Sequence, residues 1–148
     1  MKKIVTQQGA TLIEIAITVL ILSTSLLAMA TLQARSLQFN KGSVVRSQAN
    51  IFAYDIMDRI RINRGGASAN IAGYSADYGA APTGNTLAVS DVSEWRRNLA
   101  SVLPEGEGKI TCTVATRICT VTIKWSEEQM FGTSTSDSSA SLIYSTAI

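Results

Sequence analysis

The sequence predicts an α+β protein in which a long N-terminal α-helix packs on a small antiparallel β-sheet, with a short helix before the sheet. Three observations predict this fold class. An uncharged apolar run lies near the start, a helical repeat of apolar residues follows it, and two alternating segments lie nearer the C-terminus. The 148 residues suit one compact domain with an appendage.

The apolar run comprises the 20 residues from Ile15 to Ala34, none of which is charged. A helix of this length spans about 30 Å, the thickness of the hydrocarbon core of a bilayer. Lys2 and Lys3 precede the run, and the positive-inside rule places them on the cytoplasmic side. The run is therefore predicted to cross a membrane.

Two simple interpretations of this run are a cleaved signal peptide and a plain membrane anchor. Ala28-Met29-Ala30 fits the A-x-A pattern of a signal-peptide cleavage site, and the mature chain would then begin at Thr31. Glu14 argues against both interpretations. A carboxylate inside an apolar helix costs about 2.5–3.5 kcal/mol on insertion scales, and neither kind of segment has a use for it.

The start of the chain resembles the class III prepilin signal, which is a short basic leader, a glycine, a T-L-I-E motif and an apolar helix. Here Gly9 is followed by Ala10-Thr11-Leu12-Ile13-Glu14. The resemblance implies that a prepilin peptidase cuts between Gly9 and Ala10 and N-methylates Ala10. The family usually has Phe at this first mature position, so Ala10 is a departure from its pattern.

The resemblance also implies a role for Glu14. In pilins this carboxylate pairs with the N-terminal amine of a neighbouring subunit, so Glu14 is expected to pair with the Ala10 amine of its neighbour. A buried charge needs such a partner. The alternative is that Glu14 interacts only with the dipole at the start of its own helix.

The helical pattern continues beyond the apolar run and is predicted to reach Arg64. One apolar face repeats at spacings of three or four residues: Val45, Ala49, Phe52, Ile56 and Ile60. Asp55 precedes Arg59 by four residues, which favours an ion pair. Gly65-Gly66 is expected to end the helix, and Gly42 to weaken it locally. A continuous helix from Ala10 to Arg64 would be about 80 Å long.

Several blocks are similar to the PilV minor pilins in particular. They are Leu32-Gln33-Ala34-Arg35, Arg46-Ser47-Gln48-Ala49, residues 53–64 and the row from Trp95 to Gly106. The similarity implies a type IV pilin fold, with a cleaved leader at 1–9, a transmembrane and filament-core helix at 10–34, its amphipathic continuation at 35–64 and a periplasmic headgroup at 65–148. It implies a minor pilin that starts pilus assembly and supports twitching motility and adhesion.

The expected partners follow from this similarity: the prepilin peptidase, other minor pilins, the major pilin, the inner membrane and a tip adhesin. The expected location is the inner membrane before assembly, with one span and a periplasmic headgroup, and the pilus on the cell surface afterwards. A minor pseudopilin of a type II secretion system shares the leader and the helix and is the first alternative. A secreted binding domain with an ordinary signal peptide is the second.

The headgroup is predicted to begin with a long surface loop over residues 65–90, rich in Gly, Ala, Ser and Asn. Asp91-Val92-Ser93-Glu94 resembles a capping box that opens a short helix. Its apolar face is Val92, Trp95, Leu99 and Val102, and Leu103-Pro104 ends it. Trp95 is interpreted as a core residue rather than a binding anchor.

Two strands are predicted from alternating segments over residues 110–114 and 119–125. A turn at Ala115-Thr116 would place Cys112 directly opposite Cys119, close enough for a disulfide that an exported domain would form. A redox or metal pair is the alternative. The Ser/Thr-rich residues 132–141 are expected to form a loop, and residues 142–144 part of a last strand. Edge strands invite pairing with another chain, so part of the headgroup rim is expected to contact other minor pilins, and no residue in the sequence singles out the contact.

Composition argues against several other classes of function. The chain has no histidine, which excludes Ser-His and Cys-His nucleophile pairs and histidine-containing zinc sites, and its two cysteines cannot close a structural zinc site. No catalytic residue, cofactor or metal site is nominated, so the chain is not expected to be an enzyme. Beyond residue 9, Lys+Arg and Asp+Glu both number 11, so a nucleic-acid partner is not expected either.

Overall fold

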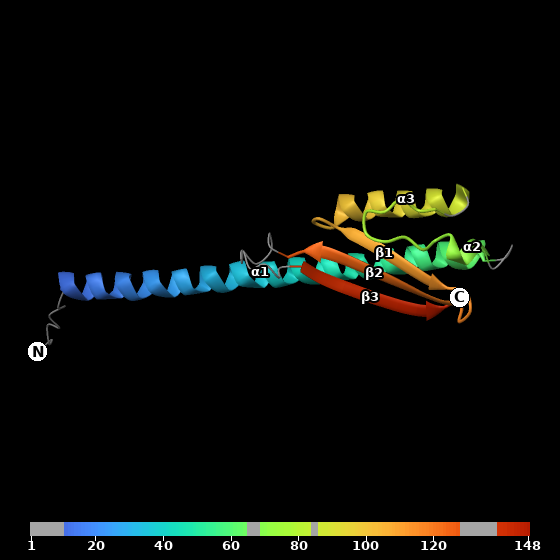
Figure 1. Cartoon of the computed structure of the whole chain (residues 1–148). Helices are drawn as coiled ribbons and strands as arrows, with labels where there is room; N and C mark the ends of the chain where they lie inside the picture. The colour runs from blue at the N-terminus through green and yellow to red at the C-terminus, as the bar shows by residue number, and fades with distance from the viewer. Residues whose placement is uncertain (1–10, 65–68, 84–85, 128–138) are drawn as a thin grey trace, which may run out of the picture. The chain divides into compact units, whose positions relative to one another are not determined.

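The computed structural model describes residues 11–64, 69–83, 86–127 and 139–148 (Figure 1). Its contacts divide the chain into two compact units, residues 1–39 and residues 40–148. Several predicted features lie outside the described residues: the cleavage site at Gly9 and Ala10, the helix-ending Gly65-Gly66 and most of the loop expected at 132–141.

Helix α1 (Leu12–Asn63) has 52 residues and contributes to both units. It confirms the predicted long helix over the described residues and continues through Gly42, which is buried in its second half. The predicted apolar face is buried from Val45 to Ile60, with Phe52 partly buried. Ala53 and Met57 are also buried, so the contact face is wider than the predicted stripe.

The second unit has one hydrophobic core, to which α1, helix α3 (Thr86–Val102) and the sheet all contribute. Its largest fully buried side chains include Ile56, Met57 and Ile60 of α1, Trp95 and Leu99 of α3, and Ile110, Val121 and Ile123 of the sheet. The described part of the chain therefore has the predicted α+β layout, with the second half of α1 and α3 packed on one face of the sheet (Figure 1).

The sheet is antiparallel and has the order β1 (Glu107–Thr113), β2 (Ile118–Ser126) and β3 (Ser139–Ala147). In β2 the predicted inward residues Cys119, Val121, Ile123 and Trp125 are buried and alternate with less buried ones. The expected loop to residue 141 is wrong at its end. β3 begins at Ser139, because Ser139, Ala140 and Ser141 continue the ladder opposite β2.

The backbone hydrogen bonds that β1 forms with Ala76 show which residue pairs of β1 and β2 are hydrogen-bonded. Ile110 exchanges both backbone hydrogen bonds with Ala76, its N–H donating over 3.0 Å and its C=O accepting over 2.9 Å. These groups therefore point away from β2, so Ile110 and Val121 form a non-hydrogen-bonded pair. Cys112 and Cys119, two residues further along, form the next pair of this kind.

The segment before α3 differs from the predicted loop over residues 65–90. It contains a short helix, α2 (Ala69–Ala72), and the bridging residue Ala76. Helix α3 begins at Thr86 rather than at Asp91, because Ala88 extends the buried face by one turn before Val92. The capping-box interpretation is therefore wrong, since Asp91 lies inside the helix.

The end of α3 agrees with the prediction in position but not in its last apolar contact. The helix ends at Val102, directly before Leu103-Pro104. Val102 was expected on the buried face, yet it is 42% exposed, whereas Leu103 is 1% exposed. The N–H of Leu103 still donates to the C=O of Leu99, as in a helix, so Leu103 takes the inward position. The chain turns after it, where the N–H of Gly106 donates to the C=O of Leu103.

Candidate functional site

The first half of α1 presents a largely apolar surface to its surroundings. Every residue from Thr11 to Phe39 is exposed, and the large apolar side chains between Leu12 and Phe39 are 51–88% exposed. Among the described residues, α1 is the one helix that is long and apolar enough to cross a membrane. An apolar surface of this extent on a protein marks a membrane or protein contact.

The five hydroxyl groups between Ile15 and Ala34 all have partners in the helix itself. The side chains of Thr18, Ser23, Thr24, Ser25 and Thr31 each donate a hydrogen bond of 2.7–3.0 Å to a backbone C=O three or four residues earlier. Such bonds satisfy polar groups where water is excluded. The segment can therefore lie in an apolar environment although it contains these hydroxyl groups.

Glu14 differs from these residues because its side chain has no partner among the described residues. It lies in the first turn of α1, where its backbone N–H donates to the C=O of Thr11 over 3.0 Å. Ala10, its expected partner in a neighbouring subunit, lies outside the described residues. The structure thus places a carboxylate at the start of an exposed apolar helix and leaves it available to another molecule.

A polar cluster joins the end of α1 to α3. Arg59 forms ion pairs with Asp55 (3.2 Å), as predicted, and with Asp91 (3.5 Å) and Glu94 (3.4 Å) of α3. Burial alone would lower the pKa of Arg59, but its hydrogen bonds with Glu94 and Asp55 outweigh that effect and raise it. One guanidinium therefore neutralises carboxylates from two helices.

Tyr74 completes this cluster from the segment that follows α2. Its hydroxyl donates to Asp91 over 2.6 Å and accepts from the side-chain amide of Asn63 over 2.9 Å. Tyr74 is fully buried, and burial together with the hydrogen bond to Asp91 raises its pKa to about 12. These contacts tie the last turn of α1 to α3 and hold the headgroup on its helix.

Arg96 anchors the loop before α3 to strand β1. Its guanidinium donates to the backbone C=O groups of Asp77, Ala80 and Gly108, with the Gly108 contacts at 3.1 and 3.2 Å. Burial lowers the pKa of Arg96, while the negative charges of Asp77 and Glu107 oppose that effect. Because the donors meet carbonyl groups, Arg96 serves to position the backbone of this loop.

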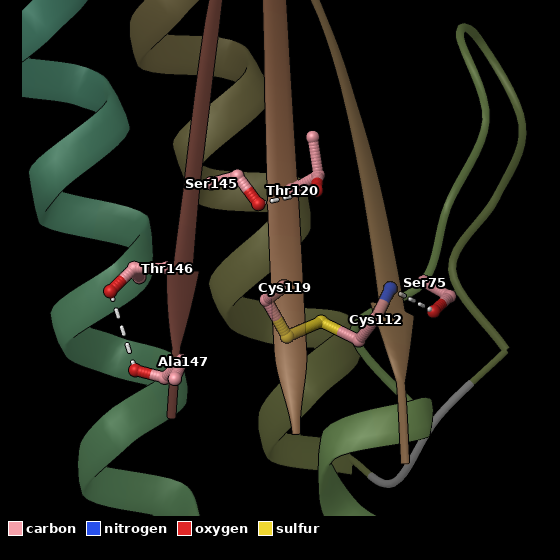
Figure 2. Close-up of a disulfide and its surroundings, with 7 residues drawn as sticks. All are labelled: Ser75, Cys112, Cys119, Thr120, Ser145, Thr146 and Ala147. Carbon is pink, nitrogen blue, oxygen red and sulfur yellow. Dashed lines mark hydrogen bonds between the residues drawn. A yellow bond between two sulfur atoms is a disulfide. The ribbon is translucent and has the colours of Figure 1, made fainter. Parts of the chain in front are cut away.

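Cys112 and Cys119 are joined by a disulfide, as the sequence predicted from their register (Figure 2). They occupy a non-hydrogen-bonded pair, and their Cα atoms are 4.1 Å apart. Cβ atoms approach most closely at such pairs, which suits a cross-strand bridge. The backbone N–H of Cys112 points away from β2 and donates to the Ser75 hydroxyl over 3.1 Å.

The sequence predicted the cysteine pair, which the structure joins, but not the contacts of Tyr74 and Arg96, and the pairing expected for Glu14 stays a prediction. Arg59 was also predicted only as a partner of Asp55. One signal could have helped: Asp91 and Glu94 are three residues apart and share a helix face, which suits a cation on a neighbouring helix.

No protein-family model, curated protein or solved structure matches this chain.

Proposed function

We propose that this chain is a structural subunit of a type IV pilus, a minor pilin of the PilV kind. The observation that carries the proposal is Glu14, a carboxylate that has no partner among the described residues and lies in the first turn of an otherwise apolar and exposed helix segment. A carboxylate in that position is costly in a lipid environment unless another group pairs with it. A neighbouring subunit that presents a positive charge supplies that pairing.

Assembly then proceeds in two stages. The first half of α1 holds the newly made chain in the inner membrane, and the prepilin peptidase cuts between Gly9 and Ala10. The new amine of Ala10 in one subunit and Glu14 of the next attract each other in a medium of low dielectric constant, where opposite charges interact strongly. Apolar helix segments from neighbouring subunits then pack together in the core of the filament.

The headgroup properties also support a structural role. The disulfide and the Arg59 cluster stabilise a small domain on the second half of α1, and the disulfide suits a chain that works outside the cytoplasm. In this proposal the subunit meets other minor pilins and the major pilin, and supports twitching motility and adhesion through the fibre and its tip adhesin.

The direct test is Glu14→Ala in cells that make the protein. We expect normal cleavage and membrane insertion, but at least about tenfold less protein in sheared fibres, since an unpaired amine is then left in the apolar core. Ser23→Ala is the matched control, because the Ser23 hydroxyl bonds only to its own helix. Normal incorporation of Glu14→Ala would refute the pairing.

Mass analysis of the N-terminus tests the processing step separately. A methylated Ala10 is the expected start of the purified chain. A chain that begins at Thr31 would instead establish a signal peptide, and one that retains Met1 would exclude prepilin processing. Deletion of the gene should reduce the number of surface fibres; a loss of protein secretion with fibres intact would reassign the chain to a secretion pseudopilus.

A further inference from the structure

The two edges of the sheet differ in how they are covered. At the β1 edge, Ala76 bridges Ile110 and the Ser75 hydroxyl accepts from the N–H of Cys112. Along the β3 edge, the described part of the chain places no strand: β3 pairs with β2 and with no other element. Within the described residues, the β3 edge is therefore the one without a neighbouring strand.

The register shows which backbone groups this edge offers. Val121 points its N–H and C=O away from β1 and toward Tyr144, its partner in β3, so alternate residues of β3 direct theirs outward. The hydrogen bond from the N–H of Ile148 to the C=O of Arg117, 2.8 Å long, obeys the same alternation. The outward-directed residues are Ser139, Ser141, Ile143, Ser145 and Ala147.

β3 has none of the features that usually protect an edge strand from pairing with another strand. Natural edge strands are usually protected by charges, proline, bulges or short length. β3 has nine residues, contains no charged residue and no proline, and pairs with β2 without a bulge. On its exposed face Ser and Ala flank Ile143, which is 67% exposed and lies at the centre of the strand.

We infer that the outer edge of β3 accepts an uncharged extended strand from a neighbouring subunit of the same assembly. The chemistry of the edge selects this partner. Among the described residues, the outward N–H and C=O groups of Ser141, Ile143 and Ser145 have no partner and match another β-strand, whereas the C=O of Ala147 accepts from the Thr146 hydroxyl. β3 itself carries no charge to pair with a charged strand. The strand addition follows from the headgroup alone, whereas the identity of the neighbour as a pilus subunit rests on the proposed function.

A two-fold pair of β3 strands from two copies does not meet these requirements. Antiparallel pairing of β3 with itself would relate two headgroups by a two-fold axis, and such a pair closes on itself. Under the proposed function the subunits repeat head to tail along a fibre, so neighbours are not related in that way. The partner strand therefore comes from a neighbour in the same orientation.

Site-specific photocrosslinking in cells that produce the full chain tests the inference. A benzophenone amino acid is placed in turn at Ser141, Ile143 and Ser145, and adducts are mapped by mass spectrometry in both membranes and sheared fibres. We expect adducts to one contiguous segment of a neighbouring subunit, displaced by two residues between successive positions, as in paired strands. Thr111, on the same face of β1, is the control position and should give none.

Substitutions at the edge then test the backbone contact itself. With the crosslinker at Ile143, Ser141→Pro removes an outward N–H, and we expect about a tenfold lower adduct yield. Ser141→Ala retains the N–H and should keep the yield. Ser145→Lys adds an edge charge without removing a backbone donor and should also lower the yield. An intact Cys112–Cys119 disulfide in each variant verifies folding.

Three results would overturn the inference: no intermolecular adduct from any of the three positions, an adduct joining Ile143 of two copies, or an adduct confined to residues 128–138 of the same chain. Absence of the wild-type chain from sheared fibres would instead refute the proposed pilus function. Adducts are also measured in membranes, so strand addition at β3 is tested even if the chain is absent from sheared fibres.

Discussion

At the scale of single residues, the closest fit in the headgroup is between Gly108 and Trp95. Gly108 is an inward-facing residue of β1, and a Cβ atom at this position would overlap the six-membered ring of the Trp95 indole. The indole is fixed in turn, because its Nε1 donates to the C=O of Phe52 in α1 over 2.9 Å. A single hydrogen at Gly108 thus allows α1, α3 and β1 to meet.

Gly108→Ala should therefore destabilise the headgroup. Since neither the ring nor the strand can move without breaking other contacts, we expect a loss of about 1–3 kcal/mol in the free energy of unfolding. Urea unfolding of the full chain in detergent, followed by tryptophan fluorescence, measures it. Lys109→Arg, on the outward face of the same strand, keeps a positive charge for the ion pair with Asp77 and is the control; it should change stability by less than about 0.5 kcal/mol.

Tyr74 makes stability depend on pH in the alkaline range. Its pKa rises from 10 to about 12 on folding, so the folded state favours the protonated hydroxyl. The stabilisation is complete below pH 10 and is lost as the pH rises toward 12, and a shift of this size corresponds to about 2–3 kcal/mol.

The measurement is the difference in unfolding free energy between the wild type and Tyr74→Phe at several pH values. We expect the wild-type advantage to be constant up to about pH 9.5 and to shrink steadily by pH 11.5. Other titrating groups cancel in this difference because both proteins carry them. An advantage that stays constant across the range would contradict the raised pKa of Tyr74.

The sequence could predict Trp95 as a core residue but not its contact with Gly108. Burial of Trp95 follows from the spacing of apolar residues on α3, a local pattern. Its contact with Gly108 depends on how α3 packs across β1, and no periodicity within either element contains that information. The same holds for Tyr74, which meets Asn63 and Asp91 only after the chain has folded back.

At the scale of elements, the β1–β2 hairpin is held by both its ladder and its disulfide. The cysteines are separated by 7 positions in the sequence, so the disulfide closes a short loop. The chain-entropy relation gives about 2.5 kcal/mol for a loop of this size. The disulfide adds this stabilisation to a hairpin that other contacts already hold in register. These are the ladder between β2 and β3 and the backbone hydrogen bonds between Ile110 and Ala76.

Replacing both cysteines by alanine should lower the free energy of unfolding by about 2.5 kcal/mol while leaving the hairpin in place. Urea unfolding measures the free energy of unfolding, and amide hydrogen exchange in β2 shows whether the hairpin remains in place. The wild type under reducing conditions is the matched control and should fall by a similar amount. A loss of protection throughout β2 in the folded variant would show that the disulfide sets the register.

The sequence predicted α1 more accurately than α3 for a physical reason. α1 keeps its periodicity over many turns, so local exceptions such as Gly42 do not alter the assignment. α3 appeared to begin at Asp91 because Asp and Glu three residues apart resemble a cap. In the structure, Tyr74 and Arg59 bind the carboxylate of Asp91, so contacts between elements determine its role.

At the scale of the whole molecule, the two units have opposite relations to solvent. The second unit buries its apolar side chains in one core, whereas the first unit exposes its own from Leu12 to Phe39. Stability of the headgroup and affinity for membranes should therefore respond to different substitutions. This separation allows each property to be tested without disturbing the other.

Leu22→Arg should weaken membrane retention and leave headgroup stability unchanged. Leu22 is 60% exposed in the first unit, and Arg at the centre of a membrane-spanning helix costs about 2.5–3.5 kcal/mol. Extraction of membranes at alkaline pH measures retention, with Leu22→Met as the control. Equal retention of both variants would show that this segment does not cross the bilayer.

The position of the disulfide determines which alignments of the β1–β2 hairpin can be oxidised. A hairpin aligned one residue out of register would turn the two sulfur atoms to opposite faces of the sheet, because side chains alternate along each strand. Oxidation can therefore lock only a correctly aligned β1–β2 hairpin. A headgroup that carries this disulfide therefore has its β1 and β2 strands in the correct register.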